Sequence, residues 1–124
     1  MQTLDNISNE AKQKHTILLA EDSSRIVLDL TYKPDVLGWF LDVTYEDADF
    51  IVRGLRITTN SNLLNQWRNK LPFGIICRCK DAQDPLLIED FLVKRASLSI
   101  LSSEEVEQIN QINAKLKDEY AKVD

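Results

Sequence analysis

Residues 25–59 constrain the fold more than any other part of the chain, because apolar and polar side chains alternate there in successive segments. The apolar positions are Ile26, Leu28, Leu30 and Tyr32 in the first segment and Trp39, Leu41, Val43 and Tyr45 in the second. Successive side chains of a β-strand point to opposite faces, so a repeat of two residues is typical of a strand with one buried face. The alternation therefore predicts strands at 25–32 and 39–45.

Short turns connect these strands to a third. The link KPDVLG is rich in turn-forming residue types, and an acidic turn with Glu46, Asp47 and Asp49 precedes the third strand, at 50–59. Three consecutive strands with such short links predict an antiparallel meander. Gly54 interrupts the third strand, and a glycine inside a strand often marks a bulge or a close backbone approach.

The rest of the chain predicts the fold class. Further strands are expected at 15–20, 74–80 and 91–100, and a short helix with apolar Leu63, Leu64 and Trp67 is expected after a cap at Asn60 or Ser61. The prediction is a mainly β protein: a small antiparallel barrel or sandwich of about six strands, with this short helix and a long C-terminal helix. Its expected parts are a polar N-terminal arm (1–14), a β domain (15–101) and a C-terminal amphipathic helix (102–124).

The C-terminal segment carries its own helix signals. Ser102 and Glu105 have the spacing of a capping box, in which the serine caps the helix and the glutamate reaches back to the exposed amide. Apolar residues then recur every three or four positions, which places them on one stripe of the helix. The stripe consists of Val106, Ile109, Ile112, Leu116, Tyr120 and Val123.

The segment from Leu28 to Leu64 reads LDLTYKPDVLGWFLDVTYEDADFIVRGLRITTNSNLL. It resembles the baseplate plug family of contractile-tailed bacteriophages, in which a hydrophobic strand, a Trp-aromatic-Leu-Asp strand, an acidic turn and a strand with Gly-(Ile/Leu)-Arg-(Ile/Leu) precede a Leu-Leu pair. The matching positions are Trp39, Phe40, Leu41, Asp42, Gly54, Leu55, Arg56, Ile57, Leu63 and Leu64. The resemblance covers roughly residues 15–101, through LPFGIICRC and FLVKRASLSIL, and the chain departs from the pattern after Ser102.

The resemblance implies a structural virion protein at the centre of a tail baseplate. Such a subunit is expected to contact the baseplate hub, the tail-tube initiator and neighbouring baseplate subunits, and to be present as a multimer. It is expected to hold hub, tube start and spike together until contraction, with no turnover and no cofactor. The expected location is the virion, after assembly in the host cytoplasm.

Composition excludes several other classes. The net charge of −5 and the pI of about 4.9 argue against nucleic-acid binding, which usually requires a basic face. No segment has the run of about 18 apolar residues that a membrane span requires, and the polar N-terminus lacks a signal-peptide core. Cys77 and Cys79 are too few and too close for a disulfide framework, and they are expected to point to one face of a strand.

Catalytic and metal chemistry find little support. His15 is the only histidine, and a dyad with Cys77 or Cys79 is disfavoured against a surface histidine and core thiols. These three residues leave a zinc site one ligand short. The acidic turn after Tyr45 is read as a solvated turn rather than a calcium site. Asp29 and Asp42 can face each other as the paired carboxylates of a glycosidase, but no cleft is indicated. We therefore expect no enzyme activity, no metal and no cofactor.

Two features favour protein interfaces. Trp67 lies outside the strand alternation, either tucked under its loop or offered to a partner. The C-terminal stripe either packs on its own domain or pairs with another subunit. The candidate interface residues are Trp67, Ile109, Ile112, Leu116, Tyr120 and Val123. The alternative function is a small β module that binds a ligand or a glycan through aromatics such as Trp67.

Overall fold

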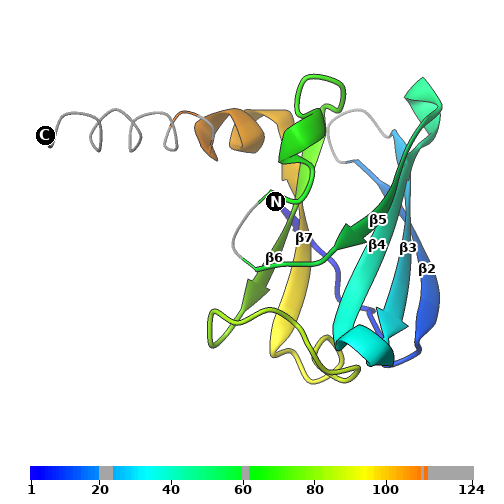
Figure 1. The fold of residues 1–124 in the computed structure, drawn as a ribbon. Helices are drawn as coiled ribbons and strands as arrows, with labels where there is room; N and C mark the ends of the chain where they lie inside the picture. Colours follow the sequence, from blue (N-terminus) through cyan, green and yellow to red (C-terminus); the bar gives the residue numbers. More distant parts are fainter. Residues whose placement is uncertain (20–23, 60–61, 110, 112–124) are drawn as a thin grey trace, which may run out of the picture.

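The computed structural model describes residues 1–19, 24–59, 62–109 and 111, and it shows two antiparallel sheets that face each other (Figure 1). One sheet has the strand order β2-β3-β4-β5 and the other the order β1-β7-β6. The strands are β1 (Gln2–Thr3), β2 (Lys12–Leu18), β3 (Arg25–Lys33), β4 (Gly38–Tyr45), β5 (Phe50–Arg56), β6 (Phe73–Cys79) and β7 (Ala96–Ser102). Of the predicted alternatives, the described residues form a sandwich and not a closed barrel.

The predicted meander is confirmed. β3 pairs with β4 from Ile26↔Tyr45 to Lys33↔Gly38, and β4 pairs with β5. Short 3-10 turns make the two links, η1 (Pro34–Val36) and η2 (Glu46–Ala48). The register of β4 with β5 shifts between Leu41 and Val43, opposite Gly54, whose φ is +71°. The glycine therefore marks a bulge, as its place in the strand pattern indicates.

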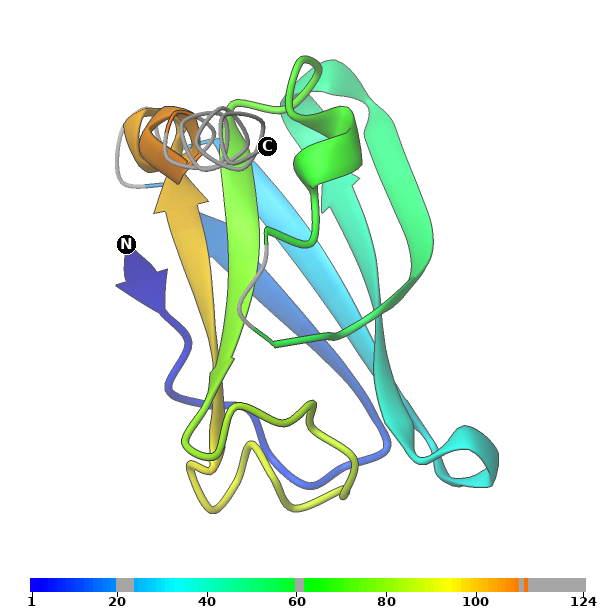
Figure 2. The ribbon, with the colours of Figure 1, turned by 60° about the vertical axis from the view of Figure 1, so that its left-hand side comes forward.

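The second sheet combines the N-terminal strand β1 with β6 and β7 from the C-terminal half of the chain. β7 pairs with β6 on one side and with the short β1 on the other, where Gln2 faces Ile100. Figure 2 shows β1 lying alongside β7. The predicted strand 91–100 is wrong in its first half, because residues 91–94 form a turn and β7 begins only at Ala96. The left-handed conformation of Lys94 (φ 64°) ends any extended pairing there.

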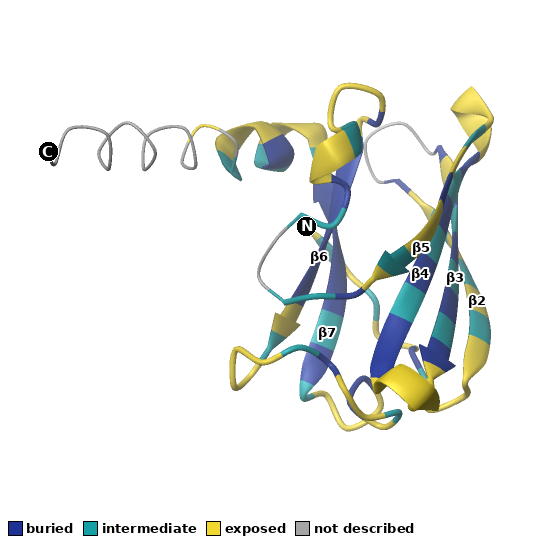
Figure 3. Cartoon of the chain, in the orientation of Figure 1, coloured by how far each residue is buried: buried dark blue, intermediate teal, exposed yellow. Residues whose placement is uncertain are grey.

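The core lies between the sheets, as the alternation requires (Figure 3). Side chains that share one face of the meander pack against those of the second sheet in one cluster. Six apolar residues in and directly after the meander strands are at most 1% exposed: Leu28, Leu30, Trp39, Leu41, Val43 and Ile57. Trp39 contacts Tyr32 and Phe91 with ring centroids 5.4 and 5.5 Å apart. The strand phase read from the sequence is therefore confirmed.

Two further expected elements, the N-terminal arm and the short helix, differ from the observed ones. The expected polar arm contributes β1, the start of β2 and the buried Ile7, so part of it belongs to the folded body. The expected short helix is a single 3-10 turn, η3 (Asn65–Trp67). The cap at Asn60 or Ser61 lies outside the described residues. Asn62 instead organises this turn, because its side-chain oxygen accepts hydrogen bonds from the amides of Leu64 and Ile75.

The C-terminal helix is shown only at its beginning, over residues 103–109, and not as a long helix. The predicted capping box is confirmed: the Glu105 amide donates to Ser102 Oγ at 3.2 Å, and the Ser102 amide donates to Glu105 Oε1 at 3.1 Å. The helix packs on the outer side of β6 and β7, where Val106 is buried with Ile76 and Leu101. A side chain at Gly74 would come within 2.8 Å of Val106 Cγ2, so glycine is what allows this close approach.

Candidate interaction surfaces

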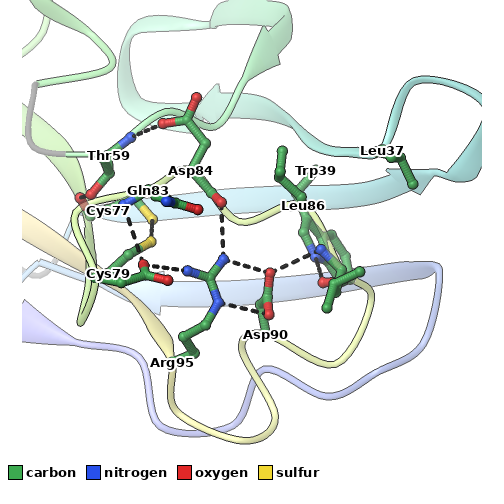
Figure 4. Close-up of polar contacts among 12 residues, drawn as sticks. Leu37, Trp39, Thr59, Cys77, Cys79, Gln83, Asp84, Leu86, Asp90 and Arg95 are labelled. Atoms are coloured by element: carbon green, nitrogen blue, oxygen red, sulfur yellow. Dashed lines mark hydrogen bonds and ion pairs between the residues drawn. The ribbon is translucent and has the colours of Figure 1, made fainter.

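The loop between β6 and β7 is built around Arg95 (Figure 4). Its guanidinium donates two hydrogen bonds to Asp90, from Nε to Oδ1 at 2.9 Å and from Nη2 to Oδ2 at 2.7 Å. It also donates to Asp81 Oδ1 at 2.6 Å and to the backbone oxygen of Asp84 at 2.9 Å. One side chain thus fixes three positions of the loop, because a planar guanidinium presents several donors at once.

Asp90 is the buried member of this network. Its side chain is 2% exposed, and its Oδ2 also accepts the amide of Leu87 at 2.9 Å. The hydrogen bonds from Arg95 are the main reason that the pKa of Asp90 is lowered, and they outweigh the burial that would raise it. Asp90 is therefore ionised at neutral pH, and the pKa of Arg95 is raised by the same pairing.

Core aromatics hold the same loop onto the meander. Tyr32 Oη donates to the backbone oxygen of Leu86 at 2.7 Å, and Trp39 Nε1 donates to that of Leu87 at 3.2 Å. The side chains of Leu86 and Leu87 remain exposed. The loop therefore forms a fixed surface at one end of the sandwich rather than a loose connection.

Trp67 belongs to η3, at the same end of the molecule as the C-terminal helix in both ribbon views (Figures 1 and 2). Its side chain is half-buried and packs against the main core cluster. This position agrees with a tryptophan tucked under its loop and leaves only part of the indole for a partner.

The candidate interface stripe is described only at its first positions. Ile109 is half-buried and packs against the cluster of Ile76, Leu101 and Val106. The other candidates, Ile112, Leu116, Tyr120 and Val123, lie outside the described residues. The beginning of the stripe therefore uses its apolar side chains within its own domain.

His15 and the two cysteines, the candidate catalytic groups, each have other partners. His15 Nε2 pairs with Gln13 Oε1 at 2.8 Å on β2, and burial lowers the pKa of His15. Cys77 and Cys79 are free thiols on one face of β6, with their sulfur atoms 3.9 Å apart, as their spacing predicts. Burial raises the pKa of Cys77, which keeps it in the unreactive thiol form at neutral pH.

Asp29 and Asp42 do lie side by side, as directly opposed partners on β3 and β4. Both are half-exposed on the face of the four-stranded sheet that points away from the core. Asp42 Oδ1 accepts the amide of Gly54 at 2.8 Å, so that carboxylate holds the bulge. Among the described residues no group of three or more His, Cys, Asp and Glu side chains could hold a metal ion.

A pocket of about 60 Å³ is lined by Leu19, Pro72 and Ile100 together with the N-terminus. This volume is far below the roughly 300–1,000 Å³ of typical small-molecule sites. In the described part of the chain no helix has the length and apolar character needed to cross a membrane.

Sequence reasoning did not find the Arg95–Asp90 network. The two residues stand only five positions apart in IEDFLVKRAS, but the sequence predicts a strand at 91–100, which begins directly after Asp90 and would extend the chain between the carboxylate and the guanidinium. The signal that was present is the run of turn formers and charges from Lys80 to Pro85, which indicates a loop that needs internal anchors.

Comparison with known proteins bears on the β domain. The family model described as cyanophage baseplate Pam3 plug gp18 matches residues 1–103. The match therefore includes both sheets and ends where the C-terminal helix begins. No curated protein matches the chain.

Proposed function

Because this chain belongs to the baseplate plug family of contractile-tailed phages, we propose that it is a structural virion subunit that helps hold the baseplate hub, the start of the tail tube and the spike together. The observation that carries the proposal is the family match over residues 1–103, which includes every strand of the sandwich. Its mechanism is assembly through complementary surfaces. We propose no catalytic step and no cofactor.

The proposed partners are the hub, the tail-tube initiator and neighbouring baseplate subunits, with several copies in one particle. The proposed location is the tail baseplate of the virion, after assembly in the host cytoplasm. Trp67 and the C-terminal stripe remain candidate contacts, with Ile109, Ile112, Leu116, Tyr120 and Val123 as the stripe positions. The half-buried state of Trp67 and Ile109 favours a partner that covers them in addition to their own domain.

The structure of the β domain suits a part that carries load without changing shape. Its core joins both sheets, and the Arg95 network fixes the long loop at one end. Rigid surfaces bind with little loss of conformational entropy, which favours stable assembly.

Deletion of the gene from the phage that encodes this chain tests the proposal. We expect particles that lack complete baseplates by negative-stain electron microscopy, and recovery when the wild-type chain is supplied from a plasmid. The chain should then be detected in purified tails by mass spectrometry. Infectious particles with normal tails that lack the chain would contradict the proposal.

The purified chain and the purified tails also distinguish this proposal from the alternative of a ligand-binding or glycan-binding module. That alternative expects the purified chain to bind members of a glycan array and to be absent from tails. The small volume of the Leu19–Ile100 pocket and the packing of Trp67 against the core give it no support.

A further inference from the structure

The side of the meander sheet that points away from the core is unusually basic for this chain. We call it the outer face. Its charged positions are Lys12, Lys14, Arg25, Asp29, Lys33, Asp42, Arg53 and Arg56. It thus carries six of the 15 cationic side chains of the protein and two of its 20 carboxylate side chains, although the net charge of the whole chain is −5.

The strand register orders these side chains into rows across the sheet. Lys12 pairs with Thr31, which in turn pairs with Phe40, and Phe40 pairs with Arg56. In the next row Lys14 pairs with Asp29 and Asp29 with Asp42. In these two rows the cations stand on the edge strands β2 and β5 and the two carboxylates on the inner strands, while Arg25 and Lys33 lie at the two ends of the inner strand β3.

The cations on this face are poorly neutralised by the contacts that the structure shows. Lys14 Nζ lies 3.9 Å from Asp29, and Arg25 Nη1 lies 3.8 Å from Glu46, both at the outer limit of an ion pair and both with exposed partners. Exposed pairs of this kind contribute little. Because its six cations outnumber its two carboxylates, the face has a net positive charge.

Part of the face is held in a fixed geometry. The Phe40 ring lies under Lys33 Nζ, 4.5 Å from the ring centre, and under Arg56, at 5.7 Å. Arg56 Nη2 donates to the backbone oxygens of Val36 and Leu37 at 3.3 and 3.2 Å. An ordered cation on an aromatic surface is a common anchor in protein interfaces.

An open depression of about 290 Å³ lies on the same face. Its lining includes Lys12, Lys14, Asp29 and Thr31. Such a depression has room for a side chain of an opposing surface, and two lysine side chains line it.

We propose that the outer face docks onto an acidic surface of another protein of the baseplate. The proposal rests on the proposed function for its setting, and on the charge of the face for its partner. A protein is favoured over nucleic acid because Asp29 and Asp42 stand together in the centre of the face, where they would repel a phosphate backbone. Half-buried Val27 and Phe40 and exposed Ile51 also give the face apolar contact area that a protein partner uses.

Binding is tested on the purified full chain by NMR. The amide spectrum is recorded during titration with a glutamate 20-mer, a lysine 20-mer and a 20-base-pair DNA duplex, at about 50 and 300 mM salt. We expect shifts confined to β2–β5 with the glutamate peptide, weaker at high salt. Shifts elsewhere, no shifts, or stronger binding of the DNA duplex would overturn the proposal.

Incorporation of variant chains into phage tails provides a second test of the outer face. The triple variant Lys12→Glu/Lys14→Glu/Arg53→Glu is compared with Arg68→Glu/Arg78→Glu/Lys80→Glu, which changes the charge equally at exposed positions off the face. We expect the first to lower incorporation into tails at least tenfold and the second to leave it within about twofold. A Lys12→Gln/Lys14→Gln/Arg53→Gln variant, with folding checked by NMR, replaces the first if added negative charge unfolds it.

The incorporation experiment distinguishes a failure of the docking proposal from a failure of the proposed baseplate function. Equal incorporation of wild-type chain and face variants refutes the docking face and leaves the baseplate function intact. Absence of the wild-type chain from tails refutes the baseplate function, while the titration still decides whether the face binds acidic polypeptide.

Discussion

At the scale of single residues, Arg95 and Asp90 decide the shape of the connection between β6 and β7, residues 80–95. Asp90 is buried, accepts two hydrogen bonds from Arg95 and also holds the Leu87 amide. Breaking a buried charge pair on one side costs about 3–5 kcal/mol, because the other charge is left without compensation. Arg95 is one-quarter exposed, so water replaces part of what is lost.

We expect Asp90→Asn to lower the free energy of unfolding by about 2–4 kcal/mol at pH 7. The effect should depend on pH with a definite sign. The pKa of Asp90 is lower in the folded protein, so its contribution is present above the unfolded value of about 4 and is lost as the pH falls through the folded pKa. Urea unfolding from pH 7 to pH 2.5 checks this, and a difference between wild type and variant that stays constant over that range would contradict it.

The alternation that predicts the core and the network that escaped prediction show what sequence can reveal at this scale. The burial of Leu41 and Val43 can be predicted from the sequence, because a repeat of two residues is a property of the strand itself. The pairing of Arg95 with Asp90 depends on a turn at residues 91–94, and its left-handed Lys94 leaves no mark in composition. Local periodicity is written in the sequence, whereas the geometry of an irregular loop arises only from tertiary contacts.

At the scale of elements, the contact between the C-terminal helix and β6 depends on a glycine, Gly74, which has no side chain to keep the helix away. A Cβ atom at Gly74 would lie 2.8 Å from Val106 Cγ2 and 2.7 Å from Asn62 Oδ1. The helix and the Asn62 turn therefore both rest on the backbone of β6 at one point. The helix start was readable from its capping box, but this crossing was not, because nothing in the sequence pairs residue 74 with residue 106.

We expect Gly74→Ala to destabilise the fold by about 1–3 kcal/mol through overpacking. Val106→Ala removes the atom that is struck, so the double variant should lose less stability than the sum of the two single changes. A double-mutant cycle by chemical denaturation measures this coupling, which should reach at least about 0.5 kcal/mol. Strict additivity would mean that the Asn62 contact, and not the helix, takes the strain.

Truncations test which part of the C-terminal segment the fold needs and which part is proposed to contact partners. Removing residues 112–124 should change the free energy of unfolding by less than about 0.5 kcal/mol, because the capping box and Val106 remain. Removing 104–124 exposes Ile76 and Leu101 and should cost about 2–3 kcal/mol, from the lost burial of apolar area.

Tail incorporation of the two truncated chains then tests the stripe. We expect the shorter deletion to weaken incorporation while the domain stays folded. Full incorporation of the chain that lacks 112–124 would remove Ile112, Leu116, Tyr120 and Val123 from the candidate contacts.

At the scale of the whole molecule, the two sheets share one core. Side chains of β3 and β4 form a single cluster with those of β6 and β7, and the loop from Lys80 to Arg95 bonds to both sheets. The antiparallel meander was predicted from its local turns. The second sheet was harder to predict from the sequence, because β1 joins it from the opposite end of the chain and consists of two residues with no strand pattern.

We therefore expect a single cooperative unfolding transition. Tryptophan fluorescence, which reports on Trp39 between the sheets and on half-buried Trp67, and far-ultraviolet circular dichroism should give the same midpoint within error. The Asp90→Asn variant should keep this coincidence at a lower denaturant concentration. Separate midpoints for the two signals would indicate that the sheets unfold as independent units.

The pairing of β1 with β7 sets an order of events during synthesis. The meander is complete once residue 56 has left the ribosome, yet the strand that covers its apolar side ends at Ser102. Thr3 Oγ1 bonds Ser99 Oγ across 96 positions of sequence, so the N-terminal residues wait for nearly the whole chain. The nascent protein thus carries a finished but uncovered sheet while the 46 residues from 57 to 102 are added, about 2–9 s at typical rates of synthesis. In that interval the chain is most exposed to aggregation and to chaperones.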